Sequence, residues 1–99
     1  MNVATEAKSK NPGHDKCAPV PFTHTQSIVT VNGSYVLLQG DSSSPHGCDD
    51  HGPHPSSIAE GSSIFFINGT PVAYESAAIS GCPVPVTVTG GDSLVSISS

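Results

Sequence analysis

The residues of this sequence that could carry out chemistry are its histidines and cysteines, which gather in three places. His14 and Cys17 lie close together near the start, residues 46–54 read His-Gly-Cys-Asp-Asp-His-Gly-Pro-His, and Cys82 stands alone further on. Imidazole nitrogen and thiolate sulfur are the ligands of tetrahedral zinc, and structural zinc sites are closed by four protein ligands. Three cysteines are an odd number, which disfavours a complete disulfide framework. The pattern therefore indicates a metal that ties separate loops together.

Several of these residues also have a simpler explanation, which the pattern alone leaves open. An isolated surface histidine, such as His24 or His51, is usually just solvated. Cys17 and Cys48 could be small buried hydrophobic residues, or could form a disulfide.

A catalytic zinc site is disfavoured by the residues around the histidines. Such a site needs three protein ligands, an open position and a nearby glutamate as base. The candidate bases Glu60 and Glu75 do not stand in an H-E-x-x-H arrangement. The serine-rich run 42–44 lacks a nucleophile-elbow motif. We therefore expect that the chain is not an enzyme.

The elements that position these residues are expected to be short β-strands. A chain of 99 residues has the length of one domain. It contains 10 Gly and 9 Pro but no Trp, a composition typical of many turns and little or no helix. A small domain with so few large core residues usually needs a disulfide, a metal or a partner surface for stability.

The charge of the chain excludes two classes of partner. The formal net charge is −5, and Lys8, Lys10 and Lys16 are the only basic residues. No basic stripe exists for nucleic acid or for an anionic membrane surface. Residues 1–12 are polar and lack the apolar core of a secretory signal, so we expect synthesis in the cytoplasm. These residues are expected to form a flexible or lightly docked arm that precedes one domain at residues 13–99.

An internal repeat organises the domain. Residues 27–36 read Ser-Ile-Val-Thr-Val-Asn-Gly-Ser-Tyr-Val, and residues 63–72 read Ser-Ile-Phe-Phe-Ile-Asn-Gly-Thr-Pro-Val, at an offset of 36 without a gap. Asn-Gly between two apolar runs is the strongest short-range hairpin signal, because both residues tolerate the positive φ of a type I′ turn. The repeat therefore predicts two hairpins. Their paired segments are expected to be 28–31 with 35–38 and 64–67 with 72–74.

A third, shorter copy of the repeat runs over residues 91–97. It follows the Gly-x-Ser-apolar pattern of residues 61–64 at an offset of 30, and the sequence ends where the Asn-Gly turn would begin. Two hairpins and one lone terminal strand make three similar units. Three units in one chain can form a pseudo-threefold cone, which can seat on a homotrimer that presents three equivalent edges.

The alternation along the repeated strands places apolar residues on both faces. One face is expected to carry Ile28, Thr30, Ile64 and Phe66, and the other Val29, Val31, Phe65 and Ile67. The pattern leaves two interpretations open. Either both faces are buried within the domain, or one apolar face meets a partner.

Residues 58–73 resemble the hallmark of PAAR-repeat proteins, whose repeat reads Gly-Ser, a strand, Asn-Gly, Pro-Ala-Ala-Arg and Gly-Asp. They read Ile-Ala-Glu-Gly-Ser-Ser-Ile-Phe-Phe-Ile-Asn-Gly-Thr-Pro-Val-Ala, and Gly40-Asp41 supplies the Gly-Asp of the first copy. The resemblance covers roughly residues 13–99. The arginine of the family is absent, and Gln39 and Tyr74 stand near its position.

The resemblance implies a small conical all-β domain of three pseudo-threefold-related hairpin or strand repeats. It also implies one structural zinc ion near the apex, held by three histidines and one cysteine. Matched residue by residue, these metal ligands are His14, His46, His54 and Cys82, and His51 is the other candidate for the third histidine.

The resemblance further implies a structural tip protein that caps and sharpens the trimeric β-helical spike of a contractile injection machine, for membrane piercing. Such machines are phage tail baseplates and type VI secretion systems. The expected partner is a homotrimeric β-helix that carries one copy of this chain, which is a monomer by itself and meets the target membrane only mechanically. The expected location is the virion, at the tip of the baseplate spike, or a secreted spike complex. A free-standing zinc-binding adaptor module is the competing class.

Overall fold

The computed structural model describes residues 1–13, 19–43, 46–48, 51–54, 56–81 and 86–97. All regular structure within these residues is β, so the expected all-β class is confirmed. The strands are short, as a sequence with frequent Gly and Pro predicts. Their bounds are β1 Asn2–Val3, β2 Lys10–Asn11, β3 Val20–Pro21, β4 Thr30–Val31, β5 Ser34–Tyr35, β6 His46–Cys48, β7 His51–His54, β8 Ser57–Ile58, β9 Phe66–Ile67, β10 Thr70–Pro71, β11 Ala78–Ser80, β12 Val86–Thr87 and β13 Asp92–Ser96.

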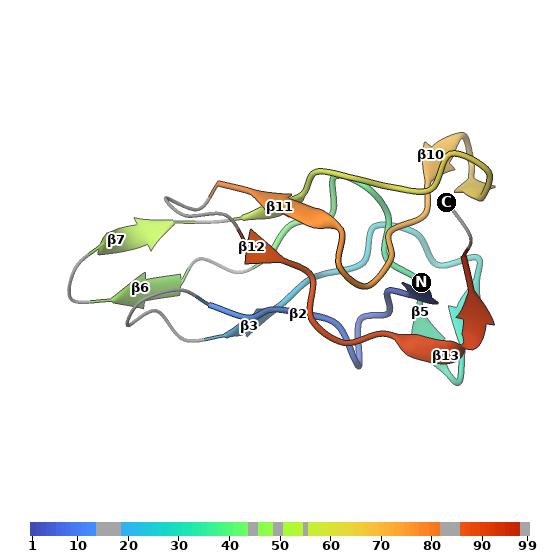
Figure 1. Ribbon diagram of the computed structural model, residues 1–99, viewed down its shortest axis with the longest axis horizontal. Coiled ribbons are helices and arrows are strands. Elements are labelled where there is room, and N and C mark those ends of the chain that lie inside the picture. The colour runs from blue at the N-terminus through green and yellow to red at the C-terminus, as the bar shows by residue number, and fades with distance from the viewer. Residues whose placement is uncertain (14–18, 44–45, 49–50, 55, 82–85, 98–99) are drawn as a thin grey trace.

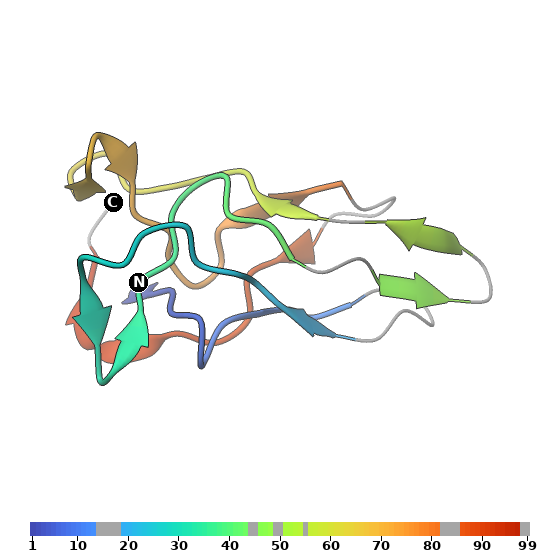
Figure 2. The same ribbon diagram turned by 180° about the vertical axis from the view of Figure 1, so that it is seen from behind.

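The strands are arranged along one long axis of the molecule, whose extents are 38 × 23 × 22 Å (Figures 1 and 2). The β6–β7 pair lies at one end of this axis, and the N-terminus, β5, β10 and β13 lie at the other. The β2–β3 pair and the β12–β11–β8 sheet lie between the two ends. We call the end formed by the pairs β4–β5, β9–β10 and β1–β13 the base.

Both Asn-Gly hairpins form at the predicted positions. Asn32 and Gly33 have φ of 51° and 78°, and Asn68 and Gly69 have φ of 51° and 81°, which are the positive values of a type I′ turn. The two-residue turns set the registers Val31↔Ser34 and Ile67↔Thr70. The named strands are shorter than predicted, although a backbone hydrogen bond from Val36 to Val29 continues the first pair, and one from Val72 to Phe65 the second.

The third copy of the repeat, expected to be a lone strand, has a partner. β13 pairs antiparallel with β1, the Met1 amino group donates to the Ile97 carbonyl at 2.8 Å, and the Ile97 N–H donates to the Met1 carbonyl at 2.6 Å. Residues 1–12, expected to form an arm, thus contribute a strand to the base. Val3 and Ala4 in this segment are fully buried. The physical reason is that the backbone N–H and C=O groups of a strand need hydrogen-bond partners, and β1 supplies them for β13.

Each of the three strand pairs of the base contains one pair of opposite residues at an equivalent position, which we call a rung. The three rungs are Thr30↔Tyr35, Phe66↔Pro71 and Ser96↔Asn2. Two residues after Tyr35, Pro71 and Asn2, the backbone closes a ring of hydrogen bonds. Leu37 N–H donates to the Ala4 carbonyl at 3.0 Å, Ala73 to Leu37 at 2.9 Å, and Ala4 to Ala73 at 3.1 Å. Each of the three segments is therefore tied to both of the others.

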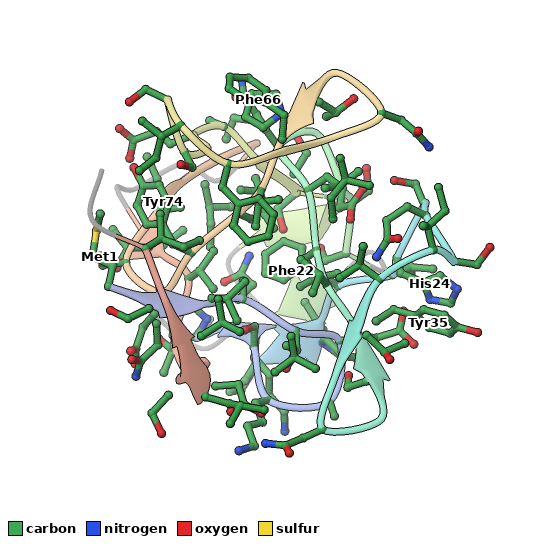
Figure 3. All side chains as sticks on the ribbon, turned by 90° about the vertical axis from the view of Figure 1, so that its right-hand side faces the viewer. Met1, Phe22, His24, Tyr35, Phe66 and Tyr74 are labelled. Carbon is green, nitrogen blue, oxygen red and sulfur yellow. The ribbon has the colours of Figure 1, made fainter. Side chains whose placement is uncertain are left out.

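Two apolar clusters fill the interior, and both combine residues from all three segments. The cluster around Phe22, which Figure 3 shows near the centre of the view toward the base, contains Ala4, Leu37, Ile58, Ala73, Ala77, Ile79 and Val88. The second cluster lies beneath the base strands and contains Val3, Val31, Val36, Leu38, Ile67, Val72 and Ile97. Most of these side chains are small, which fits the shortage of large apolar residues in the sequence.

Gly90 is expected to tolerate substitution poorly. Its φ is +86°, and a Cβ atom placed on it would lie 2.1 Å from the Lys8 backbone carbonyl oxygen. Gly40 also has positive φ, +96°, but a Cβ atom there would meet nothing within 4 Å. Gly90→Ala should lower the free energy of unfolding by more than about 3 kcal/mol, because strain and a backbone clash combine. Gly40→Ala should cost about 1–2 kcal/mol from strain alone. Urea unfolding of both variants measures the difference, and equal losses would contradict the role of the clash.

Candidate functional site

Two of the four predicted zinc ligands lie opposite each other at the end of the long axis farthest from the base. His46 in β6 and His54 in β7 are Cα partners in the antiparallel pair. Residues directly opposed in such a pair are the closest neighbours across the ladder. The structure thus brings together two positions that are separated by seven residues in the sequence.

The other two predicted ligands, His14 and Cys82, lie outside the described residues. The strands on either side of each are described, however. β2 and β3, which flank residue 14 in the sequence, pair with each other, with Lys10 opposite Pro21. β11 and β12, which flank residue 82, pair in the same way, with Ala78 opposite Thr87. Residues 14 and 82 therefore belong to connections between paired antiparallel strands, and residues 46–54 belong to the β6–β7 pair itself.

In the part of the chain whose side chains are described, no group of three or more His, Cys, Asp or Glu residues is placed to hold a metal ion. That part includes only His24 among the histidines and none of the cysteines. The ligand set His14, His46, His54 and Cys82 therefore stays a prediction, and so does His51 as its alternative.

His24, expected to be a solvated surface residue, pairs with a carboxylate that sequence reasoning did not find. Its backbone N–H donates to Glu6 Oε2 at 2.6 Å, and its ring Nδ1 contacts the same oxygen. The ring also stacks on Tyr35, with 4.1 Å between ring centroids, and Figure 3 shows the two side by side. This cluster joins the N-terminal segment to the first hairpin. No local pattern links residues 6 and 24, so the sequence carries no signal for it.

The Glu6 carboxylate should make the stability of the fold depend on pH in the acid range. The backbone hydrogen bond from His24, and then the ring contact, lower the pKa of Glu6 below its ordinary value of 4.5. A lowered folded-state pKa contributes stability that is present above the unfolded-state value and is lost as pH falls through the folded-state value. Glu6→Gln should remove this part of the pH dependence below about pH 4.5. His24→Ala should remove only part of it, since the backbone donor remains. Unfolding free energies measured between neutral and acid pH test both variants, and a Glu6→Gln profile parallel to the wild type would contradict the assignment.

The base carries exposed apolar side chains at matching positions of the repeat. Ile28, Ile64 and Leu94 are related by the offsets of 36 and 30, and their exposed fractions are 66%, 65% and 66%. Phe66 is also about half exposed, and Figure 3 shows it at the rim of the base. The alternate positions Val31, Ile67 and Ile97 are buried. One face of these strands is thus buried within this chain and the other is exposed, so the interpretation with both faces buried within the domain is wrong. Contact of the exposed face with a partner stays a prediction.

A buried polar side chain two residues earlier holds each exposed residue in place. Gln26 Oε1 accepts hydrogen bonds from the N–H groups of Ile28 and Val29 at 2.8 and 2.9 Å. Ser62 Oγ accepts from Ile64 and Phe65 at 3.1 and 3.0 Å, and Asp92 Oδ1 accepts from Leu94 at 2.9 Å. These three side chains differ in type, so a search for identical residues does not find them. Their positions nevertheless follow the offsets of 36 and 30, which a position-based comparison could have used.

Asp92 is the one buried carboxylate of this set, and it has three partners. The backbone N–H of Leu94 and then the Asn32 amide lower the pKa of Asp92, and Lys8 Nζ lies 3.3 Å from Oδ2. The Asn32 contact, at 2.8 Å, connects the turn of the first hairpin to β13. Asp92 therefore stays ionised at neutral pH and links the third strand pair to the first.

The strands of the base carry no charged side chain except that of Asp92, which is buried at the start of β13. Residues 27–35, 63–71 and 93–97 contain no Asp, Glu, Lys or Arg, although 11 charged residues occur in the chain. Neutral polar residues and exposed aliphatic ones alternate there. Such a surface suits contact with an apolar, uncharged protein surface better than contact with an ionic one.

No family model matches the sequence, and no curated protein matches it either. Among the residues that the structure describes, no helix is long and apolar enough to cross a membrane.

Proposed function

We propose that this chain is the tip of a trimeric spike, as its resemblance to PAAR-repeat proteins implies, and that the base binds the end of the spike. The observation that carries the proposal is the set of exposed residues Ile28, Ile64 and Leu94, which occupy matching positions in three strand pairs at one end of the molecule. A homotrimer offers three identical surfaces at its end, and three matching apolar residues can occupy all three at once.

The pseudo-threefold arrangement is part of the same proposal. The ring of backbone hydrogen bonds through Ala4, Leu37 and Ala73 supports it, because each member donates to one neighbour and accepts from the other at nearly equal distances. A second set also closes a ring through the three segments, with its donors running in the opposite direction. Its members are the bonds from Glu6 to Tyr35, from Gln39 to Pro71 and from Glu75 to Asn2. The two short extents, 23 and 22 Å, are nearly equal, as an object with a threefold axis along its length requires.

The β1–β13 pair gives the proposal a third complete unit. With the terminal strand alone, the base would offer two hairpins and one unpaired strand to a symmetric partner. With β1, the rung Ser96↔Asn2 matches the rungs of the two hairpins, and Leu94 matches Ile28 and Ile64. The stoichiometry that follows is one copy of this chain per trimer, and the chain alone is a monomer.

The proposed zinc site lies at the end of the molecule opposite the base. The opposition of His46 and His54 in β6–β7 fits two ligands of one ion, and the residue types of the predicted set suit tetrahedral zinc. His14 and Cys82 would supply the remaining ligands from the connections between β2 and β3 and between β11 and β12. Zinc held in this way would act as a structural cross-link between three antiparallel pairs.

The proposed role in the machine is mechanical. A narrow end stabilised by a metal concentrates force during membrane piercing, and the base transmits the load from the spike. The chain would then act in a phage tail baseplate as part of the virion, or in a secreted type VI spike complex. Binding to a homotrimeric β-helix, with a stoichiometry of one to three chains, tests the proposal.

A further inference from the structure

The base departs from its threefold pattern at one exposed position. Thr30, Phe66 and Ser96 occupy equivalent places in the rungs of the three strand pairs. All three residues are exposed, and the exposed fraction of Phe66 is 49%. Two of these places thus carry a small hydroxyl side chain, and the third carries a phenyl ring. The exposed set two residues earlier in each segment shows no such difference, because all three of its members are aliphatic and about equally exposed.

The Phe66 ring adds little to the interior of this chain. Its neighbour Phe65 packs against the cluster beneath the base, whereas Phe66 belongs to neither apolar cluster of the described residues. About half of the residue therefore stays in water in the free chain, which is unfavourable for an apolar ring of this size. Aromatic residues exposed on an otherwise uncharged surface are typical of protein–protein contacts. The ring is thus available to a partner.

The symmetry of a homotrimer says what shape that partner needs. The end of a homotrimer presents the same surface to each of the three equivalent positions. A flat surface that touched Thr30 and Ser96 would collide with Phe66, because a phenyl ring extends further from the backbone than a hydroxyl group and interfaces are closely packed. Each of the three surfaces therefore needs room for the ring, although only one of them receives it.

The position of Phe66 fits a recess that exists in three copies. Figure 3, which looks toward the base, shows the ring at the rim and away from the centre of the view. A recess on the axis of a trimer would exist once, whereas a recess away from the axis is repeated on each chain. The ring would therefore enter a recess that belongs to one chain of the trimer.

We propose that each chain of the trimeric spike carries an apolar recess at its end, and that Phe66 fills one of the three. This inference rests on the proposed function. The other two recesses face Thr30 and Ser96 and stay unfilled. Phe66 then determines specificity, because it distinguishes a spike that has the recess from one whose end is flat. The aliphatic residues of the base can contact either kind of end.

Binding of single variants to a homotrimeric β-helix tests the inference. The probe is one trimer that binds the wild-type chain, chosen from the spikes of phage baseplates and type VI secretion systems, and calorimetric titration measures the affinity. Phe66→Thr, which copies the equivalent residue of the first strand pair, should weaken binding about 10- to 100-fold. Thr30→Phe and Ser96→Phe, each made in the wild-type chain, should strengthen binding about tenfold, because each fills a further recess.

Thr87→Phe is the matched control for an added phenyl ring. Thr87 is an exposed residue of β12, away from the base (Figure 1), so this variant should bind as the wild type does. A gain of affinity cannot result from a damaged fold. Thr30→Phe and Ser96→Phe therefore keep the test decisive if Phe66→Thr lowers the stability of the chain, which thermal unfolding of each variant measures.

Three outcomes would overturn the inference while the proposed function stands. They are unchanged affinity in Phe66→Thr, unchanged or weaker binding in a folded Thr30→Phe or Ser96→Phe, and a gain of affinity in Thr87→Phe, which would mean unspecific apolar association. In each of these cases the wild-type chain still binds the trimer. If no trimer binds the wild-type chain, the proposed function and this inference are both wrong.

Discussion

Removal of zinc is expected to unfold the purified chain, and Cys82→Ala or His14→Ala is expected to have nearly the same effect. Structural zinc contributes on the order of 10 kcal/mol in small domains, whereas the whole stability of a domain is about 5–15 kcal/mol. The apolar clusters of the described residues consist mainly of small side chains, so we expect their burial to add only modest stability. Elemental analysis should find about one structural zinc per chain, and thermal unfolding with and without a chelator should differ widely.

His24→Ala is the matched control for the metal prediction. His24 is a histidine with a described partner set, Glu6 and Tyr35, and it lies outside the proposed ligand set. Loss of a partly exposed contact of this kind costs about 1 kcal/mol or less. Similar small losses of unfolding free energy in His14→Ala, Cys82→Ala and His24→Ala would contradict the ligand assignment. A zinc-free chain that is as stable as the purified one would contradict the structural role of the metal.

Ile28→Asp, Ile64→Asp and Leu94→Asp are each expected to weaken binding to a homotrimeric β-helix by at least about 100-fold, and the triple variant is expected to abolish it. Each side chain is about two-thirds exposed in the free chain, so the substitutions should barely change its stability. In the complex, each substitution would remove an apolar contact worth about 1.5–3 kcal/mol. It would also bury a carboxylate that has lost its water and has no partner. Co-elution in size-exclusion chromatography and calorimetric titration measure the loss.

Thr87→Asp, on an exposed position of β12 away from the base, controls for the added negative charge and should bind as the wild type does. The three base variants should lose similar amounts of affinity, since the three positions meet equivalent surfaces of a symmetric partner. Loss at only one of the three positions would contradict the threefold mode of binding. Unchanged binding in the triple variant would contradict the base as the attachment surface.

The local elements of this fold followed from short-range sequence patterns. Asn32-Gly33 and Asn68-Gly69 predicted the two hairpins at the observed positions, because a two-residue turn with positive φ is determined by the residues within it. The alternation of the repeated strands likewise predicted two different faces. Burial of Val31 and exposure of Ile28 agree with it, since side chains of successive strand residues point to opposite faces.

The candidate metal site could be predicted only as residue types and spacing. The opposition of His46 and His54 depends on how β6 pairs with β7, and a bulge in that pair separates the rung of His46 from that of Cys48. A bulge has no reliable signature in one sequence, because it depends on the pairing partner rather than on the strand itself.

The closure of the base was decided by tertiary structure alone. Sequence patterns ended the third unit at β13 and treated residues 1–12 as an arm, yet β1 completes that unit from the other end of the chain. The contact between Asp92 and Asn32 joins segments that are 60 positions apart in the sequence. Pairing across such separations is stabilised by burial and backbone hydrogen bonds that exist only once the three segments meet, so no local pattern can encode it. The sequence by itself determined the turns, the strand faces and the metal-binding residue types, whereas the assembly of three strand pairs into one base required the folded chain.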